Sequence, residues 1–131
     1  MGGRMLKAWM LGCSLAMLAA GTAMAEGDAA NGEKVFKRCQ ACHVVNAEQN
    51  RVGPYLKGVF GRPAGHIEGF KYSEAMAEKG KEGLVWDEAN LDKYLADPKG
   101  FVPKNKMAFP GLKKPEERAD VIAFLKQQGG S

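Results

Sequence analysis

Two cysteines and a histidine lie within five residues of one another, in Cys39-Gln40-Ala41-Cys42-His43. Cysteines at positions i and i+3 of a helical turn point to the same side. Both thiols can therefore bond to one planar ligand while the adjacent histidine faces its centre. Cys-x-x-Cys-His is the pattern by which a haem group is attached covalently. The motif predicts one haem c, bonded to Cys39 and Cys42, with His43 as an axial ligand of its iron.

Two other kinds of site use the same residue types. A structural zinc site needs four ligands, and His66 is the only other histidine. A thiol–disulfide site of the thioredoxin kind needs a βαβ context, which the sequence lacks. Both alternatives are therefore disfavoured.

The second axial position has three candidates, Met76, Met107 and His66, unless it stays open. Met76 lies in a short amphipathic segment, where a methionine usually packs into the core. Met107 lies between Pro103 and Pro110, which exclude a helix there, so that a loop presents its thioether. A soft sulfur ligand suits an electron-transfer iron and raises its reduction potential relative to two histidines. We predict Met107 as the ligand.

A histidine that binds a metal usually donates its other N–H to a nearby acceptor. The carbonyl of Pro54 is the predicted acceptor for His43, because proline fixes the local backbone. The alternative is that Pro54 is only a loop proline.

Helical signals dominate the rest of the chain, and no run alternates long enough to predict a strand. Predicted helices run from the N-cap Asp28 to about Cys39, from Ser73 to Ala77, from Asp87 to before Pro98, and from Pro115 to Gly129-Gly130. The connections 44–72 and 99–114 are long and rich in Gly, Pro and Lys. Loops of such length in a small domain are usually functional, and here they would wrap the cofactor.

The first 25 residues have the layout of a secretory signal peptide. Arg4 and Lys7 precede an apolar run from Ala8 to Gly21, and Ala23-Met24-Ala25 is a small-x-small cleavage site. The run of 14 residues is shorter than the ~20 that a membrane-spanning helix needs. An uncleaved anchor is the alternative, whereas Cys13 follows a poor lipobox.

Cleavage after Ala25 would send residues 26–131 to the periplasm as a single domain. Without Arg4 and Lys7 the net charge falls from +4 to +2, because all 15 acidic residues remain. Such a weak positive charge gives no support to nucleic-acid binding. We expect a monomer.

The mature sequence resembles mitochondrial cytochrome c and its soluble bacterial relatives, the class I c-type cytochromes. Besides the haem pentapeptide, the matching stretches are Gly32–Phe36, Gly53–Arg62, Gly69–Ser73, Leu91–Leu95, Pro103–Gly111 and Glu117–Leu125. The resemblance implies an all-α fold, the small cytochrome c fold, with about four to five helices and long loops around one covalent haem.

The same resemblance implies roles for individual side chains. Tyr72 and Trp86 would donate hydrogen bonds to a haem propionate, and Arg62 would help to neutralise it. Tyr94 and Asn105 would lie near the Met107 sulfur. Simple core packing is the alternative for each aromatic residue.

The resemblance also implies how the first and last helices pack, and the sequence differs from mitochondrial cytochrome c in two respects. Gly32 and Phe36 would pack the first helix against Phe124 of the last. The stretch around residues 78–83 is about three residues longer than in mitochondrial cytochrome c, and Asn105 replaces the usual threonine.

The resemblance implies a single-electron carrier rather than an enzyme, since iron with both axial positions filled has no open site for a substrate. Its partners would be membrane redox complexes: a cytochrome bc-type donor, and an oxidase, a photosynthetic reaction centre or a peroxidase as acceptor. The alternative function is a c-type haem peroxidase or gas-binding protein with an open sixth site.

Basic residues gather near the haem motif and the Met107 loop, whereas many acidic residues fall in the segment 74–88. This asymmetry predicts a positive face that docks an acidic partner, although a merely solvated surface is the alternative. The predicted docking residues are Lys37, Arg38, Lys57, Lys99, Lys104, Lys106, Lys113 and Lys114.

Overall fold

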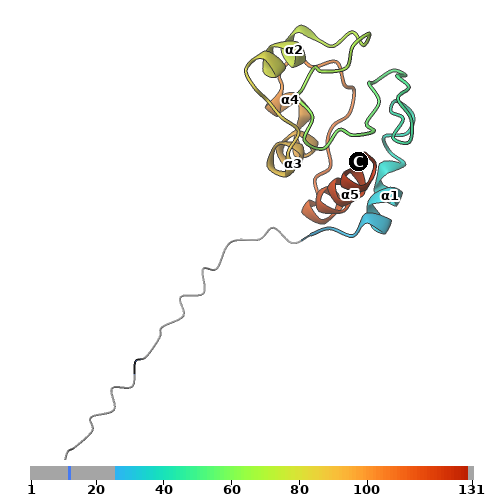
Figure 1. Cartoon of the computed structure of the whole chain (residues 1–131), viewed down its shortest axis with the longest axis vertical. Coiled ribbons are helices and arrows are strands. Elements are labelled where there is room, and N and C mark those ends of the chain that lie inside the picture. Colours follow the sequence, from blue (N-terminus) through green and yellow to red (C-terminus); the bar gives the residue numbers. More distant parts are fainter. Residues whose placement is uncertain (1–11, 13–25, 130–131) are drawn as a thin grey trace, which may run out of the picture.

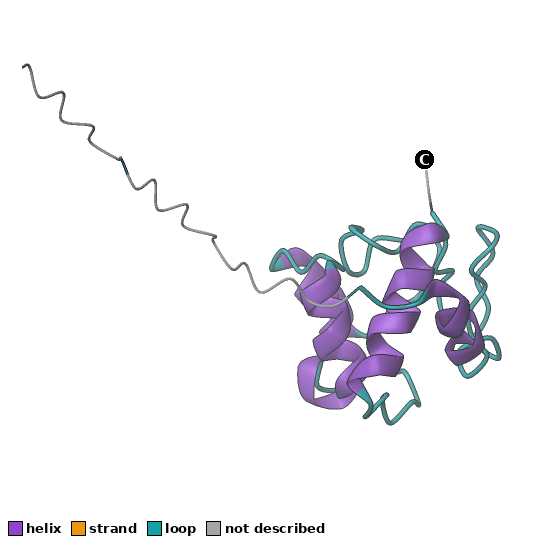
Figure 2. Cartoon of the chain, turned by 90° about the horizontal axis from the view of Figure 1, so that it is seen from below, coloured by secondary structure: helices purple, strands orange, loops and turns teal. Residues whose placement is uncertain are grey.

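A computed structural model describes residues 26–129 together with Gly12; the rest of the predicted signal peptide, residues 1–25, lies outside the described residues. Long loops connect the helices along residues 26–129 (Figures 1 and 2). These helices are α1 (Ala29–Phe36), α2 (Glu74–Lys81), α3 (Glu88–Ala96), α4 (Pro98–Phe101) and α5 (Pro115–Gln127). Within the described residues there is no strand, only an isolated bridge between Pro63 and Val85. The predicted all-α fold is confirmed.

Three helices begin at the polar residues predicted as their N-caps. Oδ1 of Asp28 accepts hydrogen bonds from the backbone N–H groups of residues 30 and 31, at 2.9 and 3.2 Å. Oγ of Ser73 accepts from Met76 N, and Oδ1 of Asp87 accepts from Asn90 N. Each bond satisfies a backbone donor that the first helical turn leaves unpaired.

Two helix ends differ from the prediction, and one short helix was not predicted. α1 ends at Phe36, and the chain continues through turns to residue 42 rather than as helix to Cys39. α2 continues to Lys81, beyond the predicted end at Ala77. α4 was not predicted: Asp97 caps this single turn by accepting from Gly100 N at 3.0 Å.

The first and last helices pack against each other, as Figure 1 shows. A Cβ added at Gly32 would collide with the carbonyl oxygen of Asp120 and lie 2.8 Å from the Phe124 Cβ. The rings of Phe36 and Phe124 lie with their centroids 5.4 Å apart. The predicted packing of α1 against α5 is therefore present, with the glycine allowing the close approach.

α3 and α5 are joined by an ion pair that is mostly shielded from solvent. Nε of Arg118 lies 2.7 Å from Oδ1 of Asp92, and Nη1 of Arg118 donates to the Leu112 carbonyl at 2.9 Å. Arg118 thus holds the chain that leaves the Met107 loop against both helices. None of the helices in residues 26–129 is long and apolar enough to cross a membrane.

Candidate functional site

The two cysteines and His43 lie on consecutive turns directly after α1. Cys39 N donates to Phe36 O at 2.7 Å, while Cys42 N and His43 N both donate to Cys39 O, at 3.1 and 3.0 Å. Both thiols are free and half-buried. Burial raises the pKa of the Cys39 thiol, with Arg38 opposing the shift, so this thiol is neutral at pH 7. Two free thiols on one turn are what covalent attachment of a haem requires.

The His43 ring is oriented by the predicted hydrogen bond. Its Nδ1 lies 2.7 Å from the carbonyl oxygen of Pro54, so Nδ1 carries the proton and donates it. Burial lowers the pKa of His43, and the positive charge of Arg62 lowers it further, against the opposing effect of the Pro54 bond. The imidazole is therefore neutral, and the lone pair of Nε2 remains available for a metal.

Gly53 leaves the space in which this ring lies. A Cβ at Gly53 would collide with Cε1 of His43 and lie 2.7 Å from its Nδ1. The N–H of Gly53 donates to the Cys42 carbonyl at 2.9 Å, which ties the two segments together. No role was predicted for Gly53 from the sequence. Its position directly before Pro54, the predicted acceptor for His43, was the feature that could have indicated one.

Met107 contacts a buried tyrosine. The hydroxyl of Tyr94 donates to the Met107 sulfur at 3.9 Å. Burial raises the pKa of Tyr94 to about 12, so the hydroxyl stays protonated and remains a donor at neutral pH. Met107 itself is half-buried and packs against the core.

Asn105 shapes the loop that presents Met107. Its side chain is buried and donates to the carbonyls of Pro98 and Val102, both at 2.9 Å, while its Oδ1 accepts from Met107 N at 2.8 Å. The expectation from resemblance was a place near the sulfur. The side-chain hydrogen bonds of Asn105 go to the loop backbone, including the N–H of Met107, so Asn105 holds the residue whose sulfur it was expected to lie near.

Arg62 is bound by carbonyl groups rather than by carboxylates. Its Nη2 donates to Tyr55 O at 3.0 Å and its Nη1 to Lys57 O at 3.3 Å, and its guanidinium lies 5.4 Å from the Tyr55 ring centroid. No carboxylate within residues 26–129 forms an ion pair with it. Burial lowers the pKa of Arg62, although Tyr72 and Tyr55 oppose this shift. Its positive charge is therefore available to an anionic group.

Tyr72 and Trp86 keep unused hydrogen-bond donors. The Tyr72 oxygen accepts from Ile67 N at 3.1 Å, which leaves its own proton free to be donated. Trp86 is buried, with its ring centroid 4.9 Å from that of Tyr94. In the part of the chain that the structure describes, its indole N–H has no acceptor.

These residues fit a covalent haem c. Two free thiols, a neutral imidazole and a thioether are the groups that attach it and bind its iron. The guanidinium of Arg62, which has no carboxylate partner in residues 26–129, and the free donors of Tyr72 and Trp86 suit the haem propionates. Among the described residues no group of three or more His, Cys, Asp or Glu side chains could hold a metal ion alone.

The predicted docking residues fall into two groups. Four are exposed and, in residues 26–129, form no ion pair: Lys37, Lys57, Lys104 and Lys106. The other four are bound within the chain: Arg38 and Lys114 to Glu117 at 2.6 and 3.9 Å, Lys113 to the Ala96 and Pro110 carbonyls at 3.0 and 3.3 Å, and Lys99 to Asn105.

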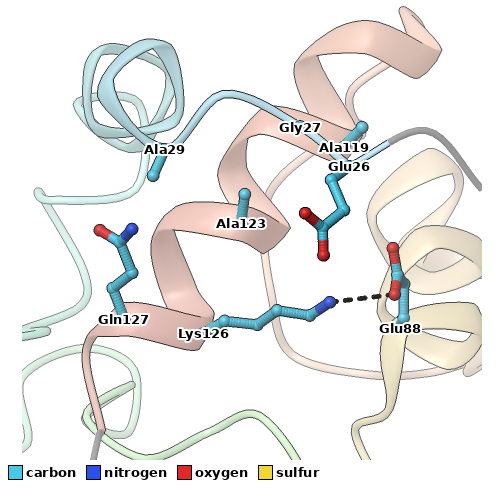
Figure 3. Close-up of a pocket in the computed structure, with 8 residues that line it drawn as sticks. All are labelled: Glu26, Gly27, Ala29, Glu88, Ala119, Ala123, Lys126 and Gln127. Carbon is cyan, nitrogen blue, oxygen red and sulfur yellow. Dashed lines mark hydrogen bonds and ion pairs between the residues drawn. The ribbon is translucent and has the colours of Figure 1, made fainter.

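A pocket on another part of the surface lies between the start of the described chain, α3 and α5 (Figure 3). Across it Lys126 Nζ lies 3.0 Å from Glu88 Oε2. None of the predicted site residues lines this pocket, so it adds nothing to the haem site.

Comparison with known proteins points to one family. A family model described as cytochrome c matches residues 29–129. A cytochrome c2 of Rhodomicrobium vannielii is 50% identical over 126 residues, which cover 95% of this chain and 97% of that protein.

Solved structures give the same result. Cytochrome cH from Methylobacterium extorquens has a TM-score of 0.70 and 52% identity, covering 77% of this chain and 99% of that one. A cytochrome c2 from Rhodospirillum centenum has a TM-score of 0.75 and 42% identity, covering 79% and 100%. These relatives lend no support to the peroxidase or gas-binding alternative.

Proposed function

Because this chain belongs to the cytochrome c family, whose members hold one covalent haem c and carry electrons, we propose that it is a periplasmic single-electron carrier with His43 and Met107 as axial ligands. Haem c, when bound, supplies an iron that alternates between the ferrous and ferric states. Cys39 and Cys42 anchor the group through thioether bonds. The fold then has to hold the ligands still and keep water away.

The observation that supports this function best is that each proposed axial ligand is held by its own hydrogen bond. Pro54 O orients His43, and the Tyr94 hydroxyl contacts the Met107 sulfur. Two ligands held in this way leave no axial position open to a substrate. Little rearrangement would then accompany a change of oxidation state, which favours electron transfer over peroxidase chemistry.

Around the propionates we propose Arg62, Tyr72 and Trp86 as the binding residues. Arg62 contributes a positive charge that no carboxylate in the described residues compensates, and the other two contribute free donors. A positive charge held close to an anionic group is stabilising where water is largely excluded.

The proposed partners are membrane redox complexes, with a cytochrome bc-type donor and an oxidase, reaction centre or peroxidase as acceptor. Lys106 directly precedes Met107 and Lys104 lies three residues before it; both are exposed and are not engaged in ion pairs among residues 26–129. These lysines favour an acidic docking surface on the partner. We propose a monomer that does not bind nucleic acid.

Export is proposed from residues 1–25, read as a signal peptide that is cleaved after Ala25. The Rhodomicrobium relative covers 95% of this chain, so the similarity extends into these residues. Positive residues, a short apolar run and a small-x-small site are the features that support cleavage.

Purification from the periplasmic fraction tests these proposals together. The mass should equal residues 26–131 plus one haem, and the pigment should stay with the protein in acid–acetone. The reduced protein should bind no carbon monoxide, and the oxidised protein should not turn over peroxide. Rapid binding of carbon monoxide would show an open axial position and favour the alternative function.

A further inference from the structure

Two segments of the chain pair side by side through their backbones. Gly61 N donates to Trp86 O at 2.8 Å, Trp86 N donates to Arg62 O at 2.9 Å, and Ala64 N donates to Leu84 O at 2.8 Å. The isolated bridge between residues 63 and 85 lies in the middle of this pairing. We call residues 61–64 and 84–86 the backbone ladder. It places Arg62 and Trp86 on adjacent segments.

α2 closes onto this ladder at a glycine. A Cβ at Gly80 would collide with the carbonyl oxygen of Ala64 and lie 3.0 Å from its carbonyl carbon. Leu84 N also donates to Lys79 O at 2.9 Å, which joins the end of α2 to the ladder. The approach is backbone against backbone, so no side-chain rotation could relieve a larger residue at position 80.

The ladder leads directly to the proposed haem contacts. Arg62 and Trp86 belong to it, and the Trp86 ring packs on Tyr94 with centroids 4.9 Å apart. The Tyr94 hydroxyl reaches the Met107 sulfur. A shift of the ladder would therefore move a positive charge and a hydrogen-bond donor, and would disturb the tyrosine at the sulfur.

We propose that Gly80 is a positioning residue that sets the reduction potential by letting α2 hold the ladder, and with it Arg62 and Trp86, in place. This inference rests on the proposed contact of Arg62 and Trp86 with the haem propionates. Gly80 lies in residues 78–83, the stretch that the resemblance implies is longer than in mitochondrial cytochrome c. A positive charge near the haem disfavours the ferric state, so displacement of Arg62 should lower the potential.

The test compares Gly80→Ala with Lys81→Ala, the next residue of α2, whose side chain is 75% exposed. For Gly80→Ala the equilibrium constant for reduction should fall by roughly two- to tenfold, where tenfold corresponds to about 59 mV for one electron. The Met–iron charge-transfer band should persist. The amide hydrogens of Ala64 and Trp86 should exchange faster. Lys81→Ala should change neither the equilibrium constant for reduction nor the exchange of these amide hydrogens.

Unchanged potential and exchange in Gly80→Ala, or an equal effect of Lys81→Ala, would overturn the inference. If Gly80→Ala does not yield folded protein, amide hydrogen exchange in the protein without the substitution tests whether α2 holds the ladder. The amides of Ala64, Leu84 and Trp86 should then become exposed together with those of α2. Continued protection of Ala64 and Trp86 after α2 has opened would show that α2 does not hold the ladder.

Arg62→Gln separates this inference from its premise. It should lower the potential without loosening α2. If Arg62→Gln lowers the potential and Gly80→Ala does not, the positioning role of Gly80 is wrong and the propionate contact stands. If neither variant changes the potential, the proposed propionate contact fails, and the inference fails with it.

Discussion

Met107 and Met76 have the same side chain but different surroundings. The Met107 sulfur accepts a hydrogen bond from Tyr94, and the backbone N–H of Met107 is held by Asn105. Met76 lies in the first turn of α2, where its N–H donates to the capping Ser73 and its side chain packs against the core. Of these two methionines, only Met107 has a sulfur with a polar partner among residues 26–129.

Met107→Ala should abolish the Met–iron charge-transfer band and lower the reduction potential, because a soft sulfur ligand that favours the ferrous state is lost. The haem should then bind cyanide. Visible spectra and a redox titration measure both effects.

Met76→Ala is the matched control and should keep the band. Because Met76 is only partly buried, this variant should lose no more folding free energy than the about 2–5 kcal/mol typical of a methionine truncated in a core. The opposite pattern, in which only the Met76 variant loses the band, would move the ligand to α2.

Residue types predicted some contacts and not others. The hydrogen bond from His43 to the Pro54 carbonyl was predicted from the residues themselves, whereas the place of Tyr94 near the Met107 sulfur was implied by the resemblance to class I c-type cytochromes. The resemblance placed Asn105 near the sulfur but did not give its bonds, because an amide has two donors and an acceptor, and its neighbours in the folded loop determine which ones are used. Gly53 was missed because the collision that excludes a side chain there exists only once His43 is in place.

Between elements, the closest contact described is that of α1 with α5. At Gly32 the helix backbones approach so closely that a methyl group would collide with Asp120 O. Phe36 and Phe124 fill the space beside it. This contact holds the turn that carries both thiols, because Cys39 N bonds to the last residue of α1.

Gly32→Ala should destabilise the protein although alanine favours a helix over glycine by about 1 kcal/mol. Overpacking costs roughly 1–3 kcal/mol, and the need for a backbone shift here puts the cost towards the upper end, so a net loss of up to about 2 kcal/mol is expected in chemical denaturation. Glu33→Ala, at the exposed next position, should change stability by less than about 0.5 kcal/mol. A stabilised Gly32→Ala protein would contradict the observed crossing.

The helix starts were predictable and some helix ends were not. Asp28, Ser73 and Asp87 act on neighbouring N–H groups, so their role is local and visible in the sequence. α2 ends at a glycine C-cap that the sequence prediction missed: Gly83 has a φ of 96°, its N–H donates to Gly80 O at 3.1 Å, and Leu84 N donates to Lys79 O at 2.9 Å. α4 is a single turn, too short for apolar periodicity, and only Asp97-Pro98 signalled it.

The basic side chains of the molecule differ in whether they already contact groups of their own chain. Lys104 and Lys106 are exposed beside Met107, whereas Arg38, Lys113 and Lys114 contact groups of their own chain. Lys81 in α2 lies 3.5 Å from Glu78. The lysines without an internal partner are those best able to attract an acidic surface.

Electron transfer to the physiological partner should slow as salt rises, because the Debye length is only ~8 Å at physiological ionic strength. Lys106→Glu should slow the second-order rate further, by up to roughly tenfold, and leave the visible spectrum nearly unchanged, since charges at an interface rim act mainly on association. Stopped-flow mixing at several salt concentrations measures this.

Lys81→Glu is the control for that experiment and should have a much smaller effect. Rates that ignore salt, or an equal effect of both reversals, would place docking on another face or make it mainly apolar.

The pairing of α1 with α5 also determines when a growing chain can fold. Residues 29–36 find their partner only after residues 115–127 have been made, so a large loop must close before either helix is stabilised. An emerging polypeptide therefore leaves Cys39 and Cys42 unprotected until it is almost complete. If haem is attached at Cys39 and Cys42 as proposed, both thiols are most accessible before the two ends of the chain have paired.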